Sequence, residues 1–162
     1  MIRQKAVFLD RDGVINNPGD NYYVYQLENF IINEGIIGFL KSVKEKKYLV
    51  IVISNQGGIA KNFYTQSDVE TLHGYLRNEL KKQQLHLDEI YYCQHHTDVE
   101  NCICRKPDSQ MLEKAIARYH IDPSASFFFG DKETDVMAGE KAGVKSIRIK
   151  ENENLNNYLH LL

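Results

Sequence analysis

Short apolar runs recur along the chain, and most of them are separated by segments in which apolar residues return with a helical period. The runs are rich in β-branched and aromatic residues, a composition that favours buried strands. We predict strands over five ranges: Ala6–Leu9, Tyr48–Ile53, Ile90–Cys93, Phe127–Phe129 and Val144–Ile149.

The amphipathic segments predict helices over Gly35–Lys46, Gln66–Gln83, Asp108–His120 and Glu133–Ala142. Thr65 or Ser67 is expected to cap the second helix, and Ser67 with Glu70 fits a capping box. Gly143 is expected to end the last helix. Because strands and helices alternate, we predict an α/β fold, a three-layer Rossmann-like parallel sheet with helices on both faces.

Length and charge narrow the class of protein. A chain of 162 residues is long enough to bury a core, and we expect residues 1–162 to form a single domain. No long insertion follows the first or second strand, so no separate cap domain is expected. The formal net charge is -2 without a run of Lys or Arg, so nucleic acid is not an expected partner.

Membrane and targeting signals are not seen in the sequence. There is no apolar stretch long enough to span a bilayer, and the chain leads into its first strand without a signal-peptide region. We therefore expect a cytoplasmic protein with no membrane partner, and we expect it to be a monomer.

Two carboxylates, Asp10 and Asp12, follow the first predicted strand. In an extended backbone they would point to the same side, at the strand end where α/β proteins bind ligands. Such a pair can hold Mg²⁺, or one carboxylate can attack an electrophile while the other transfers protons. The alternative is an ordinary Asp/Gly turn. An EF-hand is excluded because Asn21 stands where that loop requires Glu.

The ends of later strands carry complementary groups. Ser54 and Asn55, followed by two glycines, suit an oxyanion, although an ordinary turn has the same composition. Arg105 and Lys106 can bind phosphate, the alternative being a solvated basic pair, and the proline after them can start the next helix.

The fourth predicted strand ends in a second acidic group. Asp131 can supply a metal ligand opposite Asp10, with Asp135 supporting it one helical turn later, unless Asp131 is a helix N-cap. Each alternative is reasonable alone, but every cluster falls at a predicted strand end. Together they provide a nucleophile, a proton-transfer carboxylate, a hydroxyl, a cation and metal ligands, the set that phosphoryl transfer through an aspartyl-phosphate requires.

The three cysteines lie close together and near a histidine. Cys93, His95, Cys102 and Cys104 form a C-x-H and a C-x-C pair, and three thiolates with one imidazole make a closed tetrahedral zinc site. The alternatives are buried cysteines or a disulfide, which is unusual in a cytoplasmic protein. We predict structural Zn²⁺ that staples this loop, with His96 as the spare histidine.

Several motifs carry a resemblance to a known family. The order Asp10-x-Asp12, Ser54, Lys106 and Gly130-Asp131-x-x-x-Asp135 resembles the haloacid dehalogenase superfamily of phosphatases. The segments Ile90–His96 and Cys102–Pro107 are similar to its branch of heptose-bisphosphate and histidinol-phosphate phosphatases. The resemblance implies hydrolysis of the C7 phosphate of a heptose 1,7-bisphosphate in nucleotide-heptose synthesis. Histidinol phosphate or another small sugar phosphate is the alternative substrate, and a zinc-stapled binding module without catalysis is a further alternative.

The same resemblance implies a catalytic role for three acidic residues. Asp10 would be the nucleophile, and Asp12 would be the general acid/base. Mg²⁺ would bind the Asp10 carboxylate, the Asp12 backbone carbonyl and Asp131.

It also implies which residues bind a small phosphorylated substrate. Ser54 and Lys106 would hold the phosphoryl group, and Asn55 and Arg105 would bind phosphate or sugar. Lys132 would neutralise charge around the acidic residues. A flap over residues 16–25 and the zinc loop would shape a fairly open site.

Overall fold

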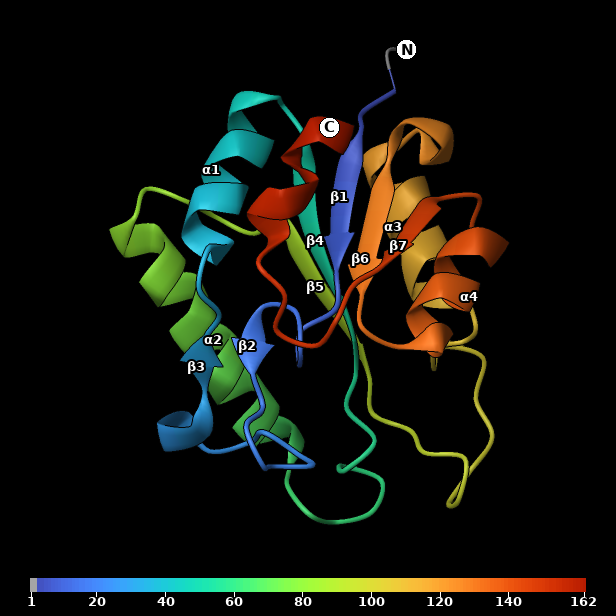
Figure 1. Ribbon diagram of the computed structural model, residues 1–162. Helices are drawn as coiled ribbons and strands as arrows, with labels where there is room; N and C mark the ends of the chain where they lie inside the picture. The colour runs from blue at the N-terminus through green and yellow to red at the C-terminus, as the bar shows by residue number, and fades with distance from the viewer. Residues whose placement is uncertain (1–2) are drawn as a thin grey trace.

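A computed structural model describes residues 3–162 and shows a central sheet between two layers of helices (Figure 1). Its five strands are all parallel, in the order β5-β4-β1-β6-β7. They span β1 (Ala6–Leu9), β4 (Leu49–Asn55), β5 (Glu89–Cys93), β6 (Phe127–Gly130) and β7 (Lys145–Arg148). The predicted α/β architecture with a parallel sheet is confirmed, and each predicted strand is found within two residues of its expected bounds.

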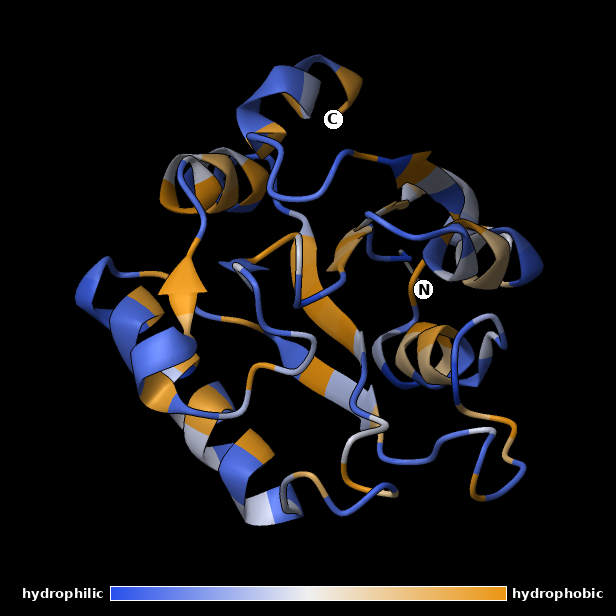
Figure 2. Ribbon diagram, turned by 60° about the horizontal axis from the view of Figure 1, so that its bottom comes forward, coloured by the Kyte–Doolittle hydropathy of each residue, from blue (hydrophilic) through white to orange (hydrophobic). Residues whose placement is uncertain are grey.

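Alternating side chains of β1 explain the layers. Val7 and Leu9 pack on one face with helices α1 (Ile36–Glu45) and α2 (Gln66–Lys82). Ala6 and Phe8 pack on the other face, as the period of two in a strand requires. There they meet the apolar sides of α3 (Gln110–Tyr119) and α4 (Glu133–Lys141), and the apolar residues line the interior in Figure 2.

Short elements complete the chain. A two-stranded antiparallel ribbon, β2 (Asn16–Asn17) with β3 (Ile31–Ile32), follows β1. Three short 3-10 helices span Leu27–Asn29, Pro123–Ala125 and Leu155–Leu161. The last of these packs beside α1. None of the helices within residues 3–162 has the length and apolar character that crossing a bilayer requires.

Two local expectations were wrong. The capping box of α2 pairs Thr65 with Asp68, because the Thr65 side chain accepts from the Asp68 N–H and the Asp68 carboxylate accepts from the Thr65 N–H. Glu70 instead accepts a hydrogen bond from the Tyr92 hydroxyl. Helix α3 begins at Gln110 and not at the proline, because a turn closed by the Asp108 N–H on Arg105 O comes first.

Candidate active site

Four charged side chains meet at the carboxyl edge of the sheet. Asp10 follows β1 directly, and its N–H donates to Phe129 O in β6 at 3.0 Å. Lys106 Nζ donates to Asp10 Oδ1 at 2.8 Å and lies 2.6 Å from Asp135 Oδ1. One carboxylate oxygen from each of Asp10, Asp131 and Asp135 lies within 4.8 Å of the other two. The strand-end clusters predicted from the sequence therefore come together.

This cluster holds more negative than positive charge in a buried place. Three carboxylates face the Lys106 ammonium group, and the Lys132 charge acts on Asp131. Asp131 Oδ1 is buried without a hydrogen-bond partner among residues 3–162. Burial raises the pKa of Asp10 to about 7, although the Lys106 charge opposes that shift. Burial also raises the pKa of Asp131. Unbalanced buried charge is costly, so this set of oxygen donors fits a hard divalent cation.

Asp12 lies beside this cluster for a different reason from the one expected. The backbone does not stay extended after Asp10, because the N–H groups of Val14 and Ile15 both donate to Arg11 O in a turn. The Asp12 carboxylate lines a pocket at the sheet edge. It is thus the turn, and not the alternation of a strand, that brings Asp12 to the site.

The Asp12 carboxylate is surrounded by donors. The Arg11 guanidinium contacts both of its oxygens, Asn16 Nδ2 donates to Oδ1 at 3.0 Å, and Gln56 Nε2 donates to Oδ2 at 3.1 Å. Burial would raise the pKa of Asp12, but the Arg11 charge and these hydrogen bonds lower it overall. The carboxylate form of Asp12 is therefore favoured in the free protein.

Gly13 allows the two acidic loops to approach each other. Its φ is +84°, and a Cβ on this residue would lie 2.7 Å from Asp131 Oδ2. Any side chain here would meet both backbone strain and a collision. The glycine after Asp12 is therefore required for Asp131 to reach the cluster.

Three of the predicted phosphate- or substrate-binding residues, Asn55, Arg105 and Lys132, line the same pocket as Asp12. Ser54 is buried at the end of β4, and Arg105 and Lys132 line the pocket wall with Asn55. The Asn55 side chain also clamps the backbone of Lys106: Nδ2 donates to Lys106 O, and Oδ1 accepts from Lys106 N, both at 3.0 Å. Asn55 therefore holds in place the residue whose ammonium group enters the cluster.

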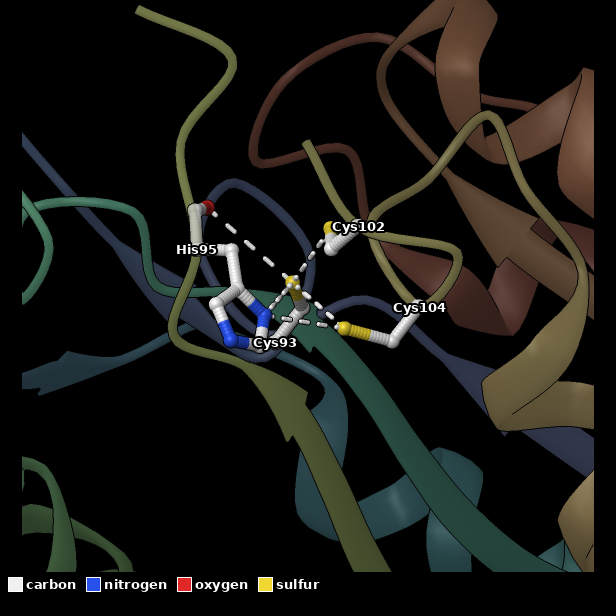
Figure 3. Close-up of side chains that lie close together, drawn as sticks. All are labelled: Cys93, His95, Cys102 and Cys104. Atoms are coloured by element: carbon white, nitrogen blue, oxygen red, sulfur yellow. Dashed lines mark hydrogen bonds between the residues drawn. The ribbon is translucent and has the colours of Figure 1, made fainter. Parts of the chain in front are cut away.

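A second cluster lies beyond the end of β5. Figure 3 shows Cys93, His95, Cys102 and Cys104 pointing toward one another. Cys93 Sγ lies 3.0 Å from Cys104 Sγ and 3.7 Å from Cys102 Sγ, while His95 Nδ1 lies 3.2 Å from Cys104 Sγ. The three thiols are free, so the structure contains no disulfide between them. His96 lies outside this group, and its Nδ1 accepts from the Asp98 N–H.

The chemistry of this second cluster suits a soft cation. Three sulfurs and one imidazole nitrogen are the ligand set of a closed zinc site. Burial raises the pKa of the Cys93 thiol, so a thiolate at this position needs a nearby positive charge. Cys102 and Cys104 belong to a segment between β5 and α3 that has neither helix nor strand. A bound cation would connect this segment to the sheet.

Comparison with known proteins relates most of the chain to one family. The chain is 44% identical over 147 residues to the D-glycero-beta-D-manno-heptose-1,7-bisphosphate 7-phosphatase of Helicobacter pylori, covering 90% of this chain and 83% of the relative. The enzyme of the same name from Haemophilus influenzae is 40% identical over 146 residues, covering 87% and 78%. The chain belongs to the heptose-bisphosphate phosphatase family.

Two further comparisons agree with this family. A family model described as "HAD-hyrolase-like" matches residues 103–159. The crystal structure of D,D-heptose 1.7-bisphosphate phosphatase from B. bronchiseptica, complexed with magnesium and phosphate, superposes with a TM-score of 0.85 at 26% identity, covering 98% of this chain and 87% of that one. As a member of this family of haloacid dehalogenase-like hydrolases, the protein is a phosphomonoester hydrolase.

The heptose-bisphosphate phosphatase family motifs do not point to every polar residue that shapes the site. Arg11, which separates Asp10 from Asp12 in the sequence, is fully buried. Its Nη2 also donates to Val24 O at 2.8 Å. Gln56 is 1% exposed and contacts Asp12. Sequence reasoning assigned neither residue a role. The available signal was their position, Arg11 between two site carboxylates and Gln56 two residues after Ser54.

Proposed function

We propose that this phosphatase removes the 7-phosphate from D-glycero-D-manno-heptose 1,7-bisphosphate through an aspartyl-phosphate intermediate. One observation carries the proposal: a buried carboxylate, Asp10, lies against the Lys106 ammonium group and two further carboxylates. This arrangement occurs in a chain that is 40% or more identical to several enzymes with that named activity.

The proposal includes Mg²⁺ at the carboxylate cluster. Asp10 and Asp131 would supply carboxylate oxygens and Asp12 its backbone carbonyl. The excess negative charge and the unpartnered Asp131 Oδ1 fit this assignment. When bound, the ion supplies positive charge that offsets the charge of the phosphoryl oxygens and of Asp10. The related B. bronchiseptica structure was determined with magnesium and phosphate, which supports the choice of ion.

The first half-reaction transfers the phosphoryl group to the protein. A carboxylate oxygen of Asp10 attacks phosphorus and forms a new P–O bond, while the bond between phosphorus and the C7 oxygen breaks. Asp12 gives its proton to the departing alkoxide. The anionic phosphoryl group beside Asp12 opposes the lowering of its pKa by Arg11, and so favours the protonated acid that this step needs.

The second half-reaction releases phosphate. Asp12, now a carboxylate, takes a proton from water as the water oxygen attacks phosphorus, and the bond to Asp10 breaks to give inorganic phosphate. The donors around Asp12 stabilise the carboxylate form that acts as base here. One residue can therefore serve both half-reactions, because Asp12 gives up its proton in the first and is left as the carboxylate that the second requires.

The remaining residues bind and orient the substrate in this proposal. Ser54 and Lys106 hold the phosphoryl oxygens, and Lys106 keeps its charge because Asp10 and Asp135 raise its pKa against the opposing effect of burial. Arg105 and Lys132 lie on the pocket wall, where they meet the second phosphate or the sugar hydroxyls. Asn55 assists by fixing the backbone of Lys106.

We further propose that Zn²⁺ binds the cysteine cluster as a structural ion. With three thiolates and His95 as ligands, no coordination position remains for substrate. The ion would fix the segment that leads to Arg105 and Lys106. In this proposal residues 1–162 act as one domain, and the site is covered by loops such as the one that carries Tyr22 and Tyr23, and not by a cap domain.

A substrate panel tests this function. The purified protein with Mg²⁺ is assayed for phosphate release from heptose 1,7-bisphosphate, in both anomers, and from histidinol phosphate. The expected result is a larger kcat/KM for the heptose bisphosphate, with the 1-phosphate retained in the product. Equal or better turnover of histidinol phosphate would contradict the proposed substrate, and failure to hydrolyse any phosphomonoester would contradict the proposed chemistry.

A further inference from the structure

The side chain of Gln56 uses all of its hydrogen-bonding atoms inside the site. It lies just beyond the end of β4 and is 1% exposed. Its Nε2 donates to Ser54 Oγ at 2.8 Å and to Asp12 Oδ2 at 3.1 Å, and its Oε1 accepts from the Tyr64 hydroxyl at 2.9 Å. One amide therefore connects the proton-transfer carboxylate, the hydroxyl at the strand end and a tyrosine from the following loop.

We propose that Gln56 is a positioning residue for proton transfer, and that Tyr64 sets the orientation of its amide. The inference rests on the proposed function, because it assigns Gln56 the task of aligning Asp12 with the leaving oxygen of an alkyl phosphate. Gln56 does not touch the reacting atoms in this role. It acts by limiting how the Asp12 carboxylate and the Ser54 hydroxyl can turn.

The contacts of Asp12 explain why Gln56 matters for alignment more than for charge. Arg11 contacts both oxygens of Asp12, and Asn16 donates to Oδ1. Without Gln56 the carboxylate would still be paired with Arg11 and would stay in place. Its Oδ2 oxygen would lose the Gln56 donor and keep only the contact with Arg11, so the carboxylate would be freer to rotate about the Cβ–Cγ bond. A small misalignment of a catalytic group is expected to slow the chemical step with little effect on folding.

The contact with Ser54 has a second consequence. Because Gln56 donates to Ser54 Oγ, it occupies an acceptor position of the hydroxyl group. Within residues 3–162 the Ser54 hydroxyl has no acceptor for its own hydrogen, which is therefore available for a phosphoryl oxygen. Gln56 therefore orients a donor for the phosphoryl group and an acid for the leaving group through the two hydrogens of one NH₂ group.

Tyr64 determines which end of the amide faces Asp12. Burial raises the pKa of Tyr64, so its hydroxyl stays protonated and donates to Gln56 Oε1. Rotating the amide by half a turn would place Oε1 against Asp12 Oδ2, where two acceptors repel. The ring fits only because residue 58 is glycine: a Cβ there would lie 2.1 Å from Tyr64 Cε1. Tyr25, from the flap over residues 16–25, stacks on the Tyr64 ring with 5.2 Å between the ring centroids.

The test compares substrates that differ in their need for a proton. A 4-nitrophenolate leaves without protonation, whereas the alkoxide of glycerol 3-phosphate or of a heptose phosphate requires general acid catalysis. For Gln56→Met we expect kcat/KM to fall about 100-fold for the alkyl phosphates but only about 5-fold for 4-nitrophenyl phosphate. Asp12→Asn serves as the reference and should show the same selectivity with a larger loss.

Tyr64→Phe keeps the inference testable if Gln56→Met does not fold. It retains the ring and removes only the hydroxyl, so we expect the same selectivity at about 5-fold loss for the alkyl phosphates. Tyr48→Phe is the matched control. Tyr48 and Tyr64 are both 6% exposed, but Tyr48 lies before β4, at the opposite end of that strand from the site. This substitution should leave both activities unchanged.

The outcomes separate this inference from the proposed function. Equal losses for both substrate types in Gln56→Met and Tyr64→Phe, with lowered melting temperatures, would mean that Gln56 only fills space, and would overturn the inference. Turnover of glycerol 3-phosphate and 4-nitrophenyl phosphate but not of heptose bisphosphate by the unmodified protein would overturn the proposed substrate. In that case the losses of kcat/KM for glycerol 3-phosphate and for 4-nitrophenyl phosphate still decide the role of Gln56.

Discussion

The carboxylate cluster and the cysteine cluster both follow strand ends, but different kinds of structure hold them. Asp10 and Asp131 follow β1 and β6, and Asp135 lies in the first turn of α4. Regular elements thus fix the carboxylates. Cys102 and Cys104 lie in a segment without helix or strand, and their approach to Cys93 is one of the contacts that tie this segment to the sheet. The sheet and helix α4 therefore position the first cluster. The second cluster lies mostly in an irregular loop and helps to hold that loop in place.

Lys106 connects the two regions. It follows Cys104 by two residues, and its ammonium group reaches Asp10 at 2.8 Å. Asn55 provides an independent anchor by binding both the N–H and the C=O of Lys106. The loop therefore supplies the Lys106 cation of the proposed active site from a segment with little structure of its own. The predictions below separate what each cluster contributes.

The largest effect is expected from the carboxylate cluster. Asp10→Asn keeps the shape of the side chain and removes the nucleophile, so kcat should fall about 1,000-fold or more. The fold and the zinc content should remain as in the unmodified protein, because α4, the sheet and the cysteines are untouched. Initial rates, circular dichroism and elemental analysis measure these three properties. Residual activity above about 1% would contradict the covalent mechanism.

Removing a cysteine-cluster ligand should affect stability first and activity second. His95→Ala should lose zinc and, with free zinc at about 1,000 times Kd, forgo about 4 kcal/mol of stabilisation. A shift of Lys106 should lower kcat/KM by about 10-fold, a loss that the Asn55 clamp limits. His96→Ala is the matched control and should keep its zinc and its stability. Loss of zinc from the control alone would exchange the roles of the two histidines.

Lowering the pH should reduce the contribution of a buried histidine near Asp12 to the stability of the folded protein. His73 is 4% exposed and lies 3.5 Å from Arg11 Nη1. Burial, and then the Arg11 charge, lower its pKa to about 3 from the ordinary 6.5. Between these values the unfolded chain binds a proton that the folded chain does not. The contribution of His73 to stability should therefore be constant above pH 6.5 and decline below it by up to about 1.4 kcal/mol per pH unit. Asp10 has a raised pKa and contributes the opposite slope in this range, so the His73 contribution is the difference between the protein and a variant without this histidine.

Urea unfolding at several pH values with zinc in fixed excess measures this dependence. His73→Gln removes the titrating group and keeps an acceptor for Arg11, so its stability should decline less between pH 6.5 and pH 5. Identical pH dependence in the two proteins would assign the acid sensitivity to the thiolate ligands of the cysteine cluster. The experiment therefore shows which of the two regions fails first in acid.

The two regions also differ in how far the sequence predicted them. Continuous apolar runs located β1, β4 and β6, and helical periodicity located the helices between them. The motif residues at the strand ends then fell into one place. The ribbon of β2 and β3 was not predicted, since two-residue strands have no detectable period. For the cysteine cluster, the close spacing of three cysteines and His95 indicated the ligand set, but it could not show the path of the loop.

Residues whose role depends on burial were the hardest to predict. Nothing in the local pattern distinguishes Arg11 from a solvated cation, yet the structure buries it completely against Asp12. The reason for the proximity of Asp12 to the site was also wrong, because a turn closed on Arg11 O replaces the expected extended backbone. Side-chain hydrogen bonds between distant segments, such as that of Tyr64 with Gln56, follow only from the assembled fold.

The smallest effect is expected from a surface ion pair that joins the loop after β4 to the loop after β5. Lys61 Nζ lies 2.7 Å from Asp98 Oδ2, but the Asp98 side chain is exposed and that of Lys61 is partly exposed to solvent. Water screens such a pair, and ordering two long side chains opposes it, so Lys61→Met should leave the melting temperature and the zinc content unchanged within error. His95→Ala, a few residues from Asp98, should lower both. If Lys61→Met instead lost zinc or melted at a clearly lower temperature, surface charge and not the bound ion would hold the segment that carries Lys106.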